Sequence, residues 1–181
     1  MVQINTKVKN TVKFQENILI RLAETTDISS FVALSYKKRR AYEKAQPQFW
    51  KYAGPESEEF QKQWFKELLR LDDHIMLAAV YKEKVLGFII GRLMSAPEVY
   101  NPGGLTLMID DFCVESKHDW NSIGQKLIKE IKELAKTKNA TQFLVVCGAY
   151  DEPKRSFLKS MGLTVASEWY VGGIIPIRDK N

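Results

Sequence analysis

Short apolar runs alternate with segments of helical periodicity along most of the chain. The apolar runs have the length and composition of strands and cover residues 18–24, 75–81, 85–94, 105–116, 141–150 and 166–177. Apolar positions recur every three to four residues in four other segments, which follow Asp27, Ser57, Ile123 and Asp151. This alternation predicts an α/β (α+β) fold with a mixed, mostly antiparallel sheet of about six to seven strands and about four flanking helices.

The chain has the length of one domain. Its 181 residues match a prior of roughly 100–200 residues per domain, and 45% hydrophobic residues exclude disorder over most of it. Residues 1–17 are polar and include three lysines, so we expect a flexible N-terminal arm. Residues 18–181 are then the single folded domain.

Charge and cysteine content limit the classes of protein to which this chain can belong. Lysine plus arginine exceed aspartate plus glutamate by 27 − 22 = 5, which suits either nucleic acid or a small anionic cofactor. Two cysteines and two histidines exclude a zinc finger and a disulfide framework, so we expect a reducing compartment and no metal. No apolar run resembles a signal core or a membrane span, which predicts a cytoplasmic protein without membrane contact.

Two local clusters allow more than one interpretation. Residues 37–40 are all cationic and follow a predicted helix, where they form either a solvated last turn or a basic rim for a phosphate-bearing ligand. The loop after that helix contains Phe49, Trp50 and Tyr52, either packed under the sheet or forming the wall of a substrate pocket.

The most informative segment is a strand, a turn and a long helix over residues 105–136. A turn that leads directly into a helix N-terminus offers backbone N–H groups to an anion such as phosphate. Acidic residues interrupt the lysines of the helix throughout, which argues against a nucleic-acid surface.

The region from 18 to about 171 resembles the GNAT superfamily of N-acetyltransferases. The segment DDFCVESKHDWNSIGQKLI falls on the family's acidic strand end and its Arg/Gln-x-x-Gly-x-Gly/Ala turn, with Asp119, Ser122 and Gly124 at the three defining positions. DEPKRSFLKSMGL matches the later Asn-x-x-Ala-x-x-Phe-Tyr signature, with Leu158 at the tyrosine position. Within the superfamily, the sequences of these two segments are most similar to the diamine and polyamine acetyltransferase branch.

The resemblance implies where acetyl-CoA would lie. Its pantetheine would add to the separating ends of the fourth and fifth strands, along the backbone of Phe112, Cys113 and Val114. The pyrophosphate would rest on the turn, which comprises Asp119, Trp120, Asn121, Ser122, Ile123, Gly124 and Gln125. Three residues of the later signature would lie close to the cofactor, namely Asp151, Lys154 and Phe157.

The implied reaction moves an acetyl group directly to a small primary amine. Asp110 would be the base, Asp111 its neighbour on the other strand face unless a bulge intervenes, and the Val114 amide would polarise the thioester. Because Leu158 replaces the tyrosine that protonates the thiolate, we expect slower transfer unless Tyr150, Tyr170 or Cys147 takes its place.

A second hypothesis remains open. The changes at 119, 122 and 158 are equally typical of a catalytically weakened GNAT-like protein that binds CoA or acyl-CoA as a sensor or interaction module. Family members often pair, so a homodimer is possible.

Overall fold

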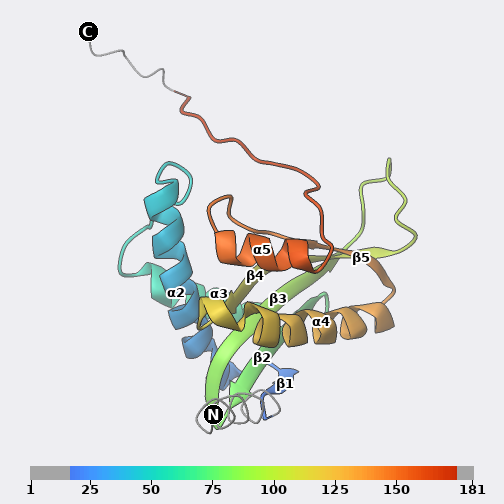
Figure 1. Cartoon of the computed structure of the whole chain (residues 1–181), viewed down its shortest axis with the longest axis horizontal. Coiled ribbons are helices and arrows are strands. Elements are labelled where there is room, and N and C mark those ends of the chain that lie inside the picture. The colour runs from blue at the N-terminus through green and yellow to red at the C-terminus, as the bar shows by residue number, and fades with distance from the viewer. Residues whose placement is uncertain (1–16, 175–181) are drawn as a thin grey trace, which may run out of the picture.

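One five-stranded sheet organises the part of the chain described by the structure, a computed structural model covering residues 17–174 (Figure 1). In spatial order the strands are β1 (Leu19–Leu22), β2 (His74–Tyr81), β3 (Lys84–Met94), β4 (Leu105–Val114) and β5 (Ala140–Val145). The first three pairings are antiparallel, and β4 pairs with β5 in parallel. The prediction of a mixed, mostly antiparallel sheet is confirmed.

Helices cover both faces of this sheet and divide the core into two clusters. The α-helices are α2 (Ile28–Ala45), α3 (Ser57–Leu68), α4 (Gln125–Thr137) and α5 (Glu152–Ser160). Shorter helical turns are η1 (Thr25–Asp27), η2 (Lys117–Asp119) and η3 (Trp120–Gly124). Phe31 of α2 and Phe65 of α3 pack on Phe88 of β3, whereas Ile131 of α4 and Phe157 of α5 belong to the cluster on the opposite face. The expected number of helices is confirmed within the described residues.

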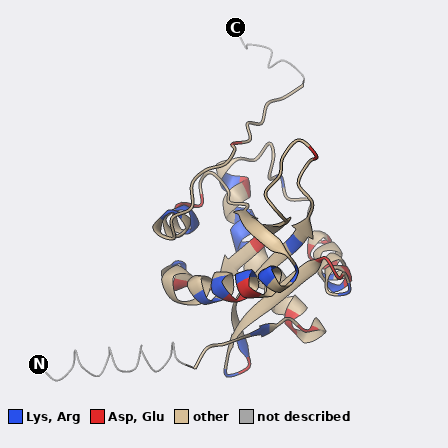
Figure 2. Ribbon diagram, turned by 90° about the vertical axis from the view of Figure 1, so that its right-hand side faces the viewer, with Lys and Arg blue, Asp and Glu red and all other residues tan. Residues whose placement is uncertain are grey.

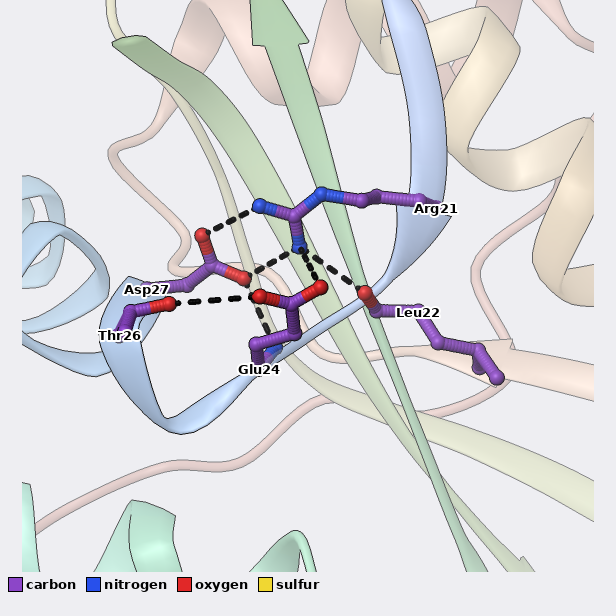
Figure 3. Close-up of polar contacts among 5 residues, drawn as sticks. All are labelled: Arg21, Leu22, Glu24, Thr26 and Asp27. Atoms are coloured by element: carbon purple, nitrogen blue, oxygen red, sulfur yellow. Dashed lines mark hydrogen bonds and ion pairs between the residues drawn. The ribbon is translucent and has the colours of Figure 1, made fainter. Parts of the chain in front are cut away.

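A buried aspartate fixes the passage from β1 into α2 (Figure 3). The Arg21 guanidinium donates to both carboxylate oxygens of Asp27, at 2.6 and 2.9 Å, and the Glu24 amide donates to the same carboxylate. Asp27 precedes α2 as expected, but its side chain makes no capping bond to that helix. Its charge instead ties the end of β1 to η1, and this sets where α2 starts.

The expected count of six to seven strands is wrong, because the closing strands do not form over 166–174. This segment extends away from the sheet, and Trp169 and Tyr170 are 84% and 89% exposed (Figure 1). Aromatic and β-branched residues favour strands only where a neighbouring strand supplies hydrogen bonds. Residues 175–177 of the expected strand lie outside the described residues, as do residues 1–16 of the expected arm.

Two helices differ from their sequence-based predictions. The first continues through the cationic residues 37–40 and ends only at Ala45, two residues before Pro47. In α3 the sequence predicts an apolar stripe of Phe60, Trp64, Leu68 and Leu69. Of these Leu68 is buried as expected, whereas Phe60 is 70% exposed, and the helix buries Gln61 and Phe65 beside Leu68. The ring of Phe65 reaches Phe88, and this contact selects the buried face.

Charges are distributed without a single-sign face. Lysine and arginine alternate with aspartate and glutamate over the helices (Figure 2). Within residues 17–174, no helix is long and apolar enough to cross the hydrocarbon core of a membrane. No group of three or more His, Cys, Asp or Glu side chains over the same residues is arranged to hold a metal ion.

Gly87 is the point where β3 and β4 leave no room for a side chain. A Cβ at this position would lie 2.9 Å from the carbonyl oxygen of Cys113 and 3.1 Å from Cγ2 of Ile123. Because a backbone oxygen cannot rotate away, we expect Gly87→Ala to lower the free energy of unfolding by about 1–3 kcal/mol. Gly172→Ala is the matched control, since its Cβ meets no atom within 4 Å. Equal urea midpoints for the two variants would contradict this packing.

Candidate functional site

A bulge in β4 separates the two adjacent aspartates. Ile90 of β3 pairs with Asp111 and Gly91 pairs with Ile109, so Asp110 is the extra residue without a register partner. A bulge interrupts the alternation of side chains along a strand. Asp110 is consequently exposed, whereas Asp111 is buried on the side of the sheet that α2 covers. The bulge that the sequence analysis allowed for is present, so the alternation of a regular strand does not apply to this pair.

Asp111 forms a buried ion pair with α2. Lys38 Nζ lies 3.0 Å from its Oδ1, and Arg39 Nη2 lies 3.4 Å from its Oδ2. Burial alone would raise the pKa of Asp111, but the two cations outweigh this effect and lower it. Lys38 and Arg39 therefore form neither a solvated last turn nor a free basic rim. An ionised, paired carboxylate holds α2 against β4 and is a poor proton acceptor.

Asp110 has the opposite electrostatic environment. Partial loss of hydration, followed by the negative charge of Asp111, raises its pKa above the usual value for an aspartate. A carboxylate with a raised pKa that stays in contact with solvent is better suited to accept a proton. Of the two aspartates, the structure leaves Asp110 able to act as a base.

The strands β4 and β5 part next to this bulge. Their ladder runs from Leu105 and Ala140 to Ile109 and Val145, and ends with a hydrogen bond from the Val146 amide to the Ile109 carbonyl. Residues 111–114 continue to pair with β3 only. The backbone of Phe112, Cys113 and Val114 thus faces the separating strands, as the sequence implied.

A buried lysine lies where β4 and β5 begin to separate. Lys154 of α5 is completely buried, and its Nζ donates to the Val146 carbonyl at 2.9 Å. The ammonium lies 5.3 Å from the ring centre of Phe112 and 6.0 Å from that of Trp120. Burial, followed by the charge of Lys38, lowers its pKa to about 8. Lys154, expected close to the cofactor, thus lies with its ammonium at the carbonyl that follows β5.

Several residues assigned to the cofactor turn are core residues in the structure. The ring of Trp120 stacks on Phe157 at 5.4 Å and meets Phe112 edge-on at 4.9 Å. A Cβ on Gly124 would approach the Trp120 ring to 2.9 Å, so the indole explains the need for glycine. Ile123 is also fully buried. The side chains of Trp120 and Ile123 are packed into the core, so these residues can offer an anion only their backbone groups.

The turn itself is helical from its first residue. It runs through η2 and the π-helical turn η3 into α4, and Ser122 Oγ donates to the carbonyl of Asp119. The first N–H groups of a helix have no partner within it. Here Ser116 accepts from two of them, through its hydroxyl from the His118 amide and through its carbonyl from the Asp119 amide. Partial burial and the charge of Glu115 raise the pKa of Asp119. Gln125 opens α4 at the end of the turn.

Asp151 is engaged in the fold on both carboxylate oxygens. Its Oδ1 accepts from the Lys154 amide and caps α5, and its Oδ2 accepts from the Tyr42 hydroxyl at 2.8 Å. The Gly148 amide donates to the same hydroxyl. Tyr42 was missed by sequence reasoning, because only the fold brings α2 beside the connection between β5 and α5. Its i+4 spacing from Lys38 on α2 is the one signal that the sequence contained.

The candidate replacements for the absent tyrosine are dispersed. Leu158 is buried in the core, Tyr150 is 70% exposed, and the Tyr170 hydroxyl donates to Glu168 on the extended segment. Burial raises the pKa of the Cys147 thiol, which keeps it protonated.

The aromatic loop lines a pocket and does not lie under the sheet. Phe49, Trp50 and Tyr52 border a partly open cavity of about 220 Å³. Its other lining residues come from the same loop, α2 and the first turns of α3, namely Arg39, Lys51, Ala53, Ser57 and Gln61. Of the two interpretations of this loop, the described structure supports the pocket wall.

A comparison of sequence families agrees with this architecture. The sequence profile described as the acetyltransferase (GNAT) family matches residues 39–163, from α2 to the end of the α5 signature. The chain belongs to the acetyltransferase (GNAT) family. No curated protein sequence matches it closely enough to count as a relative.

Solved structures place this GNAT chain in the same fold. A mutant of the BH1408 protein from Bacillus halodurans superposes with a TM-score of 0.74 at 17% identity, over 87% of this chain and 99% of that one. A predicted acetyltransferase from Clostridium acetobutylicum, solved with acetyl-CoA, gives 0.67 at 16% identity over 87% and 96%. The aminoglycoside acetyltransferase meta-AAC0020 from an uncultured soil sample, solved with sisomicin, gives 0.59 at 21% identity over 91% and 99%. These likenesses concern the fold, and none singles out the polyamine branch.

Removing the Asp111 charge should expose how strongly α2 depends on it. Asp111→Asn leaves Lys38 buried without its partner, which we expect to lower the free energy of unfolding by about 3–5 kcal/mol at neutral pH. Since folding lowers the pKa of Asp111, its stabilisation is present above the unfolded pKa of about 3.9 and is lost as pH falls below it. The difference in the free energy of unfolding between the wild type and Asp111→Asn, about 3–5 kcal/mol at neutral pH, should therefore disappear toward pH 2. The exposed Asp72→Asn serves as control; parallel curves for both variants would contradict the assignment.

The lowered pKa of Lys154 should make the free energy of unfolding depend on pH above neutrality. Its pKa is about 8 in the fold and about 10.4 unfolded, so the unfolded chain binds more protons between these values and stability rises with pH there. The gain should reach about 3 kcal/mol. We expect Lys154→Met to abolish this rise and the exposed Lys159→Met to retain it, as measured by urea unfolding from pH 7 to 10.5. A rise that persists in Lys154→Met would show that another group is responsible.

Proposed function

We propose that this chain is an acetyl-CoA-dependent N-acetyltransferase that acts on a small primary amine, with Asp110 as the base. The observation that carries the proposal is the exposed, bulged Asp110 with a raised pKa, positioned where β4 separates from β5. Membership of the GNAT family and a structural neighbour solved with acetyl-CoA support the donor.

The residues present fit acetyl-CoA in part. Residues 112–114 offer strand hydrogen bonds to an extended pantetheine arm, and the N-terminal turn of η3 offers amides to a pyrophosphate. Asp119 and Glu115 oppose an anion at this turn, although the raised pKa of Asp119 makes its neutralisation easier. We therefore expect binding that is weaker than in family members with arginine at that position.

The amine must lose a proton before or during attack. A protonated amine has no lone pair, so Asp110 would accept the proton, directly or through water, as nitrogen bonds to the acyl carbon. The carbon–sulfur bond breaks, and the sulfur takes a proton to leave as a thiol. The Val114 amide would donate to the acyl oxygen as negative charge develops on it.

The proton for the departing sulfur has no dedicated donor among the residues assigned from the sequence. Because a thiol has a pKa of about 8.5, its thiolate is a fair leaving group. Water can therefore supply this proton, and the reaction is only modestly slower. Tyr150 is solvent-exposed, whereas Tyr42 is buried against Gly148 and kept protonated by a raised pKa. Tyr42 is thus the better-placed phenol relative to the separating strands.

A second candidate function is CoA binding without turnover. The specific observation that favours it is the Lys154 ammonium and the Trp120 ring, which pack together beside the β4 end that pantetheine would follow. This reading predicts CoA affinity with no release of free thiol in the presence of amines.

The test of the proposed function combines titration and turnover. Acetyl-CoA should bind by isothermal titration, and amines should release free thiol in a coupled assay. We expect Asp110→Asn to lower kcat by about 10²–10⁴-fold, the usual contribution of a positioned base, while the dissociation constant for acetyl-CoA stays unchanged.

The control and the contrary outcomes are distinct. Asp72→Asn, which lies on the surface outside the site, should retain the wild-type rate. Binding without thiol release for any amine would favour the sensor function. Absence of acetyl-CoA binding at millimolar concentration would overturn both functions.

A further inference from the structure

Two buried polar side chains of α3 lack partners and line the pocket of the aromatic loop. Gln61 is 8% exposed, yet its Nε2 has no hydrogen-bond partner, and the buried Ser57 Oγ also has none. Leaving a buried donor unsatisfied is costly, and native proteins do so rarely. An amide NH₂ group and a hydroxyl that border an open cavity therefore indicate a ligand with hydrogen-bond acceptors.

The charges of this pocket identify the kind of acceptor. Its lining includes Arg39 and Lys51 and contains no carboxylate. The ion pair with Asp111 engages Nη2 of Arg39, which leaves other donors of the five on a guanidinium. Ser57 is the first residue of α3, so the positive end of the helix dipole also points to this end of the cavity. Donors, two cations and a helix N-terminus together match a carboxylate.

The remaining wall is apolar and the volume is small. Phe49 and Trp50 meet edge-on at 4.7 Å, and Tyr52 completes the aromatic side. A cavity of about 220 Å³ is below the roughly 300–1,000 Å³ that hold drug-sized molecules, and suits a ligand the size of an amino acid.

The pocket adjoins the candidate base through one residue. Arg39 lines the cavity and lies 3.4 Å from Asp111, which follows Asp110 in β4. The anionic end of a ligand held by Arg39 would thus lie next to the side chain that pairs with Asp111. This relation connects the pocket with acetyl transfer and not with a separate activity.

We propose that this pocket binds the carboxylate of the acceptor, so that the acceptor is a small amino carboxylic acid with an apolar body and not a polyamine. The identity of the ligand as an acceptor rests on the proposed acetyl transfer, whereas the carboxylate site itself stands on the pocket. A dication such as putrescine would meet Arg39 and Lys51 with like charge, which opposes binding.

Three amines separate the relevant features. L-Phenylalanine and phenethylamine share the amine and the ring and differ in the carboxylate, and putrescine carries a second cation. Binding is measured without acetyl-CoA, by calorimetry and by the fluorescence of Trp50 with Trp50→Phe as blank. We expect L-phenylalanine to bind about 10–100-fold more tightly than phenethylamine, the effect of charged hydrogen bonds. Equal binding of the pair, tighter binding of putrescine, or no binding of L-phenylalanine at millimolar concentration would overturn the proposal.

Variants test whether the named side chains are responsible. Gln61→Leu should remove most of the preference for L-phenylalanine and raise the Tm, because it deletes an unsatisfied buried donor; a purely structural glutamine would lower the Tm. The exposed Lys51→Gln should also weaken the preference without affecting folding. Lys44→Gln, on the same helix as Arg39 but outside the pocket, should change neither.

Turnover separates this proposal from the proposed function. If L-phenylalanine binds as expected but no amine releases thiol, the carboxylate site stands and acetyl transfer fails. If phenethylamine or putrescine is acetylated with a kcat/KM equal to or above that of L-phenylalanine, acetyl transfer stands and the carboxylate site is refuted.

Discussion

The buried ion pair between Asp111 and the cations of α2 is the constraint on which the site depends. It joins the longest helix of the described chain to the bulge of β4, at a place where one unpaired charge would be costly. Lys38 and Arg39 lower the pKa of Asp111 and keep it ionised, and its negative charge adds to partial loss of hydration in raising the pKa of the adjacent Asp110. The same contact holds Arg39 at the edge of the aromatic pocket. One interaction thus distinguishes the two aspartates and positions the pocket beside them.

A second set of contacts shapes the opening between β4 and β5. Tyr42 and Asp151 join α2 to the start of α5, and Lys154 extends from α5 to the carbonyl that follows β5. Lys154 is buried and Tyr42 and Asp151 are half-buried, so these polar contacts add hydrogen-bond geometry to the packing around the strands. The Trp120 ring, which stacks on Phe157 of α5, packs beneath the turn of residues 119–125. These contacts surround the opening beside which Asp110, the proposed base, lies.

Much of this was predictable from local pattern. Hydrophobic periodicity identified the helices and the central strands. The two strands over 75–81 and 85–94 are joined at Lys82 and Glu83, whose positive φ values suit a tight turn. The motif around Asp110 and the α5 signature led to the family. The errors share a cause: the closing strand at Trp169, the exposed Phe60 and the solvated Lys38 were each judged from their neighbours in sequence. Strand pairing, the buried face of a helix and the partner of a charge are contacts between distant residues.

The sequence by itself therefore determined the order of elements, the family and the residue types available for acetyl transfer, because these follow from periodicity and motif spacing. The tertiary structure decided which aspartate is free. A one-residue bulge turns Asp110 outward and Asp111 toward α2, and no pattern of residue types reveals the register in which two strands pair. It also gathered Arg39, the aromatic loop and Gln61 from three segments around one cavity. Chemistry that depends on such convergence exists only after the chain has folded.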